Sequence, residues 1–131
     1  MVARCVLVAV LVLCVSASAC AKASDRTEAE VNWTLMSLVD DRELDLQAEF
    51  GGSSCSEFKR WDVTEDSDSV TIRATAEFFG DSCTSDLVFE PTSIVLDEPL
   101  GDRRLLGCRP DSPATAGSNR APIDDCRQTA G

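Results

Sequence analysis

Apolar and polar residues alternate along two segments of the chain with the period of a β-strand. The segment 43–50 (ELDLQAEF) has an apolar side chain at every second position, and the segment 69–78 (SVTIRATAEF) keeps this pattern throughout. Successive side chains of a strand point to opposite faces, so the apolar residues of each segment share one side. The alternation predicts two half-buried strands of an antiparallel sheet.

The segment 31–39 (VNWTLMSLV) carries two patterns at once. Helical spacing relates its aliphatic residues, and the preceding TEAE at 27–30 resembles a capping box at a helix N-terminus. With a period of two, Trp33, Leu35 and Val39 instead share one face of a strand. The turn-forming DDR at 40–42 leads directly into the strand at 43–50, so we favour a strand that forms a hairpin with it.

Shorter apolar runs suggest the rest of the sheet. The segment 58–64 is a predicted strand with Trp61 and Val63 facing inward. The run 87–89 should stop before Pro91, because proline cannot continue a central strand. The segments 92–96 and 104–107 add further short strands. Strands that recur with turns between them predict an all-β fold, a small antiparallel β-sandwich or open barrel of about five to six strands with two disulfides.

Three regions flank the β-domain, which we expect to span 31–108. The segment 1–19 has one early arginine, an apolar run and small residues at its end, the pattern of an export signal peptide. The segment 20–30 is small and charged, as in a linker or tether. The segment 109–131 contains three prolines and one large aliphatic residue, which predicts an irregular C-terminal tail.

Cys20 follows the small residues of the predicted signal and resembles the lipidated cysteine of bacterial lipoproteins. Ala17 stands where that pattern prefers leucine, and ordinary cleavage at 17–19 or 21–23 is an alternative. The cysteines after Cys20 are even in number and can all pair in disulfides, which leaves Cys20 unpaired. A lipid on Cys20 would account for this. We expect an exported protein anchored by lipid on the outer face of the cell membrane, with free secretion as the alternative.

The remaining cysteines, Cys55, Cys83, Cys108 and Cys126, predict two disulfides in an oxidising compartment. Four cysteines allow three pairings, and the sequence does not choose between them. We expect Cys55–Cys83 to link the ends of neighbouring strands and Cys108–Cys126 to attach the tail. No two of them have the close spacing of structural zinc ligands, so we expect no zinc site.

Charge and composition exclude several classes of function. The formal net charge is −11, or −12 once Arg4 leaves with the signal, and such a chain is repelled by nucleic acid. The sequence has no histidine and no glycine-rich phosphate loop, so we expect neither His-dependent catalysis nor a cofactor. The acidic turns 40–41 and 65–68 do not continue into a calcium-binding loop, and we interpret them as solvated turns.

The segment 96–108 (LDEPLGDRRLLGC) concentrates charged residues around a proline and a glycine. Its EPLG places these two at the favoured second and fourth positions of a type I turn. Asp97 and Asp102 can accept hydrogen bonds from backbone amides, and Arg103 or the next arginine can pair with them. We interpret Asp97, Glu98, Asp102 and Arg103 as a structural turn, with a binding role as the alternative.

The same segment, preceded by Cys55, the SVTI strand and the Cys83-Thr84 pair, resembles a pattern of small exported proteins of actinobacteria. The resemblance covers 33–108, and the closing LDEPLGDR is its distinctive motif. It implies an exported β-domain with these boundaries. That family has no assigned activity, so the resemblance implies no function.

Together these observations predict a protein that binds rather than catalyses. We expect the partner to be an envelope or extracellular protein, with no nucleic acid and no membrane contact beyond the lipid anchor. The alternative is a freely secreted, disulfide-braced inhibitor of an extracellular hydrolase. Its inhibitory loop would lie near Cys55 or between Cys108 and Cys126.

Overall fold

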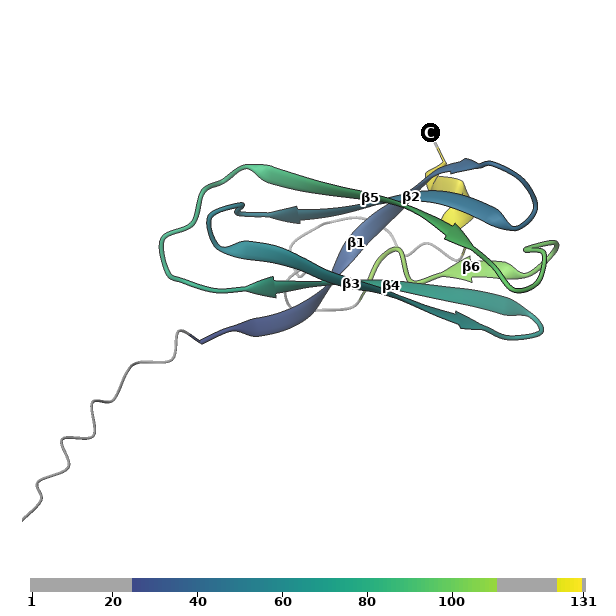
Figure 1. The fold of residues 1–131 in the computed structure, drawn as a ribbon, viewed down its shortest axis with the longest axis horizontal. Helices are drawn as coiled ribbons and strands as arrows, with labels where there is room; N and C mark the ends of the chain where they lie inside the picture. The colour runs from purple at the N-terminus through teal and green to yellow at the C-terminus, as the bar shows by residue number, and fades with distance from the viewer. Residues whose placement is uncertain (1–24, 111–124, 131) are drawn as a thin grey trace, which may run out of the picture.

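A computed structural model describes residues 25–110 and 125–130, which form a small all-β domain (Figure 1). Its strands are β1 (Thr27–Leu38), β2 (Glu43–Gly51), β3 (Ser56–Glu65), β4 (Ser69–Phe78), β5 (Leu87–Val95) and β6 (Arg104–Leu106), followed by the 3-10 helix η1 (Cys126–Thr129). They build one curled antiparallel sheet in the order β3-β4-β1-β2-β5, and β6 pairs with β4 in parallel. The predicted fold class is confirmed.

The long strand β1 belongs to both layers of the curled sheet. Its first part, Thr27 to Val31, pairs with β4, and the part from Asn32 onward pairs with β2. Figure 1 shows β1 passing from the layer of β3 and β4 to the layer of β2 and β5. The sheet therefore folds over itself along β1 and encloses a core between its two layers.

The core comes from the alternating residues of the inner strands. The largest fully buried side chains are Trp33, Leu35, Leu44, Leu46, Val70, Ile72, Leu96 and Leu105, with Cys108 and Cys126. Each large aliphatic side chain buried in this way contributes about 1.5–3 kcal/mol. The strands predicted for 43–50 and 69–78 are confirmed, and so is the choice of a strand for 31–39.

Along one edge of β4, the residues up to Thr71 pair with β6 and those from Ala74 onward pair with β1. Ile72 lies between these two stretches. The Trp33 indole N–H donates to the Ile72 carbonyl over 2.9 Å, in place of a ladder bond. Gly107 has a φ of +101°, and a Cβ at its position would lie 2.0 Å from the same carbonyl oxygen. Only glycine permits this approach of the two backbones.

Three details of β1 and β5 differ from the prediction. β1 begins at Thr27, inside the expected linker, because its first residues pair with the end of β4. Val39 lies beyond β1 and is exposed. A bulge between Leu35 and Ser37 changes which residues of the following segment face the core. β5 continues through Pro91, which is tolerated because β5 is an edge strand paired only with β2.

The strands β3 and β5 are the two ends of the strand order, and the barrel is open between them. Each paired neighbour along the order is antiparallel, so β3 and β5 run in the same direction. Phe58 and Trp61 on β3 are only partly buried, and Val63, predicted to face inward, is exposed. No strand covers this side of β3, which explains the exposure of Val63. We call the gap between β3 and β5 the seam.

The two ends of the domain differ in character. β1 starts at the end that carries the Cys55–Cys83 disulfide, on the left in Figure 1. At the other end three acidic turns meet, which connect β1 to β2, β3 to β4 and β5 to β6. Backbone hydrogen bonds join them: Leu96 donates to Arg42, Leu100 to Asp41, and Arg104 to Asp68.

Both predicted disulfide pairings are present. The Cα atoms are 5.3 Å apart in Cys55–Cys83 and 5.9 Å apart in Cys108–Cys126, within the usual range. The second disulfide attaches η1, whose Thr129 hydroxyl accepts the Leu35 N–H over 2.9 Å beside the β1 bulge. The described end of the predicted irregular tail is thus a 3-10 turn packed on β1. Residues 111–124 of that tail lie outside the described residues.

Candidate functional site

A hollow of about 600 Å³ opens at the end of the domain where the acidic turns meet. Its lining residues come from the end of β3 and from the segment after β5: Glu65, Asp66, Ser67, Asp97, Glu98 and Arg103. We call it the acidic hollow. It brings together Asp97, Glu98 and Arg103 of the predicted turn, while Asp102 is not part of its lining.

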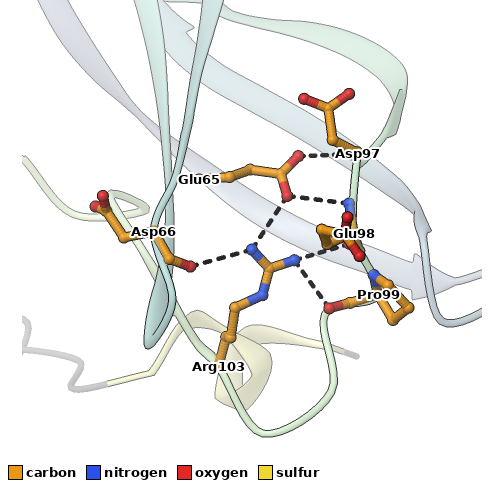
Figure 2. Close-up of polar contacts among 6 residues, drawn as sticks. All are labelled: Glu65, Asp66, Asp97, Glu98, Pro99 and Arg103. Carbon is orange, nitrogen blue, oxygen red and sulfur yellow. Dashed lines mark hydrogen bonds and ion pairs between the residues drawn. The ribbon is translucent and has the colours of Figure 1, made fainter.

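The guanidinium of Arg103 is the centre of the acidic hollow (Figure 2). It donates to the carboxylate of Glu65 over 3.1 Å and to the backbone carbonyl of Asp66 over 3.2 Å. Its other terminal nitrogen donates to the carbonyls of Glu98 and Pro99, both over 2.8 Å. The Arg103 side chain is only 12% exposed. Its two terminal nitrogens are occupied by its own chain.

Glu65 is the acidic partner, and its carboxylate holds the chain that leaves β5. It accepts the Asp97 N–H over 2.7 Å and the Glu98 N–H over 3.3 Å, in addition to Arg103. Partial burial raises the pKa of Glu65, but these hydrogen bonds outweigh burial, so the pKa lies below its ordinary value. The ionised form is therefore the one that stabilises the fold.

The predicted pairing of Arg103 or Arg104 with Asp97 or Asp102 was wrong, since Arg103 pairs with Glu65 instead. The Asp97 carboxylate points away from Arg103 in Figure 2, and Asp102 is exposed. Glu65 takes this place because β3 and β5 run in the same direction, so their ends lie together. The sequence signal for this partner is the acidic turn 65–68, whose predicted role is that of a solvated turn.

The turn itself also lies elsewhere than predicted. Arg103 N–H donates to the Leu100 carbonyl over 3.0 Å, so the hydrogen-bonded turn spans 100–103 rather than 98–101. Gly101 is its second residue with a φ of +50°. That angle suits a type II′ turn, which takes glycine at this position. Leu100 folds into the core and is buried, as a structural turn requires.

The opposite end of the seam is closed covalently. Cys55 lies immediately before β3 and Cys83 shortly before β5, so their disulfide joins the starts of the two edge strands. Nearby, the Asp86 carboxylate accepts the Ser53 N–H over 3.1 Å. Hydrogen bonds from Ser53 and Thr84 lower the pKa of Asp86 to about 2. The seam is thus fastened at both ends, by a disulfide at one and by Glu65 and Arg103 at the other.

The acidic hollow therefore has a structural role first. The carboxylates of Asp66, Asp97 and Glu98 are exposed to solvent in this hollow. They form no hydrogen bond with the side chains that the structure describes. Within 25–110 and 125–130, no group of three or more Cys, Asp or Glu is arranged to hold a metal ion. Such a hollow can attract a cation, and its one guanidinium is already committed to the fold.

Comparison with protein-family models, with curated protein sequences and with solved structures finds no match to this chain. The resemblance of 33–108 to exported actinobacterial proteins stays a prediction. In the part of the chain that the structure describes, no helix is long and apolar enough to cross a membrane. Cys20, the predicted lipidation residue, lies outside the described residues.

Proposed function

We propose that this protein is exported and held on the outer face of the cell membrane by a lipid on Cys20, where it binds a partner protein and catalyses no reaction. The observation that carries the proposal is the pair of disulfides, both of ordinary Cα separation. Disulfides of this kind persist in oxidising compartments outside the cytoplasm. An exported chain also explains the apolar segment before Cys20.

The start of β1 supports a tether at this place. Residues 21–26 alone separate Cys20 from Thr27, a length that spans at most about 20 Å when fully extended. β1 begins at the end of the domain opposite to the acidic turns. A lipid on Cys20 would hold the acidic end away from anionic lipids, which would repel it.

The state of Arg103 supports binding over catalysis. Catalytic cations must be able to reach a reacting group, whereas the terminal nitrogens of Arg103 donate to Glu65 and to three backbone carbonyls. A screen against broad hydrolase substrates tests this part. Turnover that is lost when one carboxylate is replaced would contradict it.

The intact mass of the native protein tests the anchor. We expect a membrane-bound species that begins at Cys20, carries added acyl mass, and gains about four mass units on reduction of two disulfides. The Cys20→Ala variant should appear in the medium without that mass. An unmodified wild-type species in the medium would contradict the anchor.

One observation favours a second candidate, a secreted inhibitor of an extracellular hydrolase. The exposed segment 80–86 is braced by the Cys83 disulfide and by the Thr84 N–H, which donates to the Ser54 hydroxyl over 3.0 Å. Rigid exposed loops suit inhibitors, because little flexibility is lost on binding. The medium fraction should then inhibit secreted hydrolases, and reduction of the disulfides should abolish the inhibition.

A further inference from the structure

The outer face of the layer formed by β2 and β5 carries two contrasting rows of side chains. Strand β2 contributes Glu43, Asp45, Gln47 and Glu49, and strand β5 contributes Leu87, Phe89, Pro91, Ser93 and Val95. The rows lie side by side because the two strands are paired, with Phe89 opposite Glu49 and Val95 opposite Glu43. We call this surface the β2–β5 face.

The β5 row is unusually apolar for an exposed strand. Leu87 is 56% exposed, Phe89 51% and Val95 70%. Single exposed apolar residues are ordinary, but aligned ones along an edge strand favour aggregation unless something covers them. An aligned apolar row of this kind is typical of an interaction surface.

The β2 row is acidic, and the one arginine next to it in the sequence is Arg42, in the turn before Glu43. The sequences of β1, β2 and β5 contain no lysine or arginine. Glu43 and Glu49 are half-buried, and neither forms an ion pair with another residue that the structure describes. Asp45 accepts hydrogen bonds from the hydroxyls of Ser37 and Ser93, which are neutral. These carboxylates are therefore partly buried and form no ion pair with the residues that the structure describes.

The outer face of the other layer is built differently. There Arg60 pairs with Glu28 over 2.7 Å and Arg73 pairs with Glu30 over 3.3 Å. Glu77 pairs with both Arg26 and Lys59. Its charges are neutralised across strands, whereas those of the β2–β5 face are not. Of the two outer faces, the β2–β5 face is therefore the one complementary to an incoming cation.

We propose that the β2–β5 face docks a cationic amphipathic segment of the partner protein, with apolar side chains on β5 and Lys or Arg side chains on β2. This inference rests on the proposed binding function and names its surface and partner chemistry. The acidic row disfavours a second copy of the chain and an anionic lipid surface, since both would add like charge. Pro91 interrupts the free edge of β5, so recognition would use side chains rather than an added strand.

The probe is a synthetic amphipathic helix of leucine and lysine, about 14 residues long, with a scrambled peptide of the same composition as its control. Titration of each peptide into the purified mature chain with both disulfides formed gives its Kd. We expect the amphipathic peptide to bind at least about tenfold more tightly than the scrambled one. Equal affinity, or no binding of either peptide, would overturn the proposal.

Matched variants locate the site. The Glu43→Gln/Glu49→Gln variant should weaken binding about tenfold, and Phe89→Ser should have a comparable effect. The Glu28→Gln/Glu30→Gln variant removes the same charge from the other face and should change Kd by less than about twofold. Equal losses from both charge pairs, or self-association of the wild-type chain through Phe89, would overturn the proposal. The mass measurement at Cys20 is independent, so failure of the anchor and failure of this site are distinguishable.

Discussion

The two ends of the seam fasten the same pair of edge strands by different chemistry. At one end the Cys55–Cys83 disulfide joins the starts of β3 and β5. At the other end, Glu65 at the end of β3 holds the backbone just after β5 and pairs with Arg103. The covalent link is indifferent to protonation, whereas the polar one requires an ionised carboxylate and a guanidinium with several partners. Perturbing each end separately should reveal this difference.

Removal of the disulfide should have the largest effect. We expect the Cys55→Ala/Cys83→Ala variant to lose about 3–4 kcal/mol in the free energy of unfolding, because the bond closes a long loop in the unfolded chain. Urea denaturation measures the loss. A loss below about 1 kcal/mol would mean that the disulfide does little to hold the seam.

Removal of the guanidinium should have the next largest effect. Arg103→Met leaves Glu65 without its counter-charge and three carbonyls without their donor, which should cost about 2–3 kcal/mol. Arg103→Lys should recover only part of this, since an ammonium lacks the fork that reaches all these acceptors. The matched control is Arg73→Met in the exposed pair with Glu30, which should cost at most about 0.5 kcal/mol. Comparable losses at both sites would argue against the role of Arg103.

Acid should weaken the polar end before the covalent one. The pKa of Glu65 is lowered in the fold, so its contribution is present above the ordinary value of 4.5 and is lost as pH falls through the folded value. The stability difference between wild type and Glu65→Gln should therefore shrink as pH falls below 4.5. Urea denaturation over a pH series measures it. A difference that is constant with pH would contradict the assigned ionisation.

The same pH series sharpens the comparison at the disulfide end. The pKa of Asp86 is lowered from 3.8 to about 2, so the stability difference between wild type and Asp86→Asn should be constant above pH 3.8 and should be lost progressively as pH falls from 3.8 through about 2. Loss of this difference already near pH 4 would contradict the proposed hydrogen bonds to Ser53.

The turn that carries Arg103 should show the smallest effect. Gly101→Ala should cost about 1 kcal/mol, because the φ of +50° strains an L-residue while the nearest atom to a new Cβ, at 4.0 Å, leaves space for it. Asp97→Asn is the control, with a change within about 0.5 kcal/mol, since only the backbone of Asp97 binds Glu65. Thermal unfolding measures both variants. A larger effect of Asp97→Asn would indicate a role for its carboxylate.

The inner strands could be predicted because their signal is local. Residues 43–50 and 69–78 each have one face on the core, and a period of two records this directly in the sequence. The course of β1 could not be predicted in the same way. Which strand pairs with Thr27 or with Asn32 depends on the whole sheet, and so does the parallel entry of β6 beside β4.

Contacts between residues distant in the sequence could not be predicted at the candidate site either. Asp97, Glu98 and Arg103 were predicted to lie together because they share one short segment, and all three line the acidic hollow, but the turn is at 100–103 rather than at 98–101. The partner of Arg103 was missed because Glu65 is distant in the sequence, and only the common direction of the two edge strands brings them together. Pro91 misled the prediction of β5, since the sequence does not say which strand is at the edge.

The acidic turns lie at the opposite end of the domain from the start of β1, and this separation would set their distance from a membrane that holds Cys20. Strands of about ten residues are about 33 Å long, which is roughly four Debye lengths at physiological salt. With a lipid on Cys20, the turns would stand beyond the electric field of the lipid headgroups. Their negative charge would then be felt by approaching proteins and ions, and not by the membrane beneath.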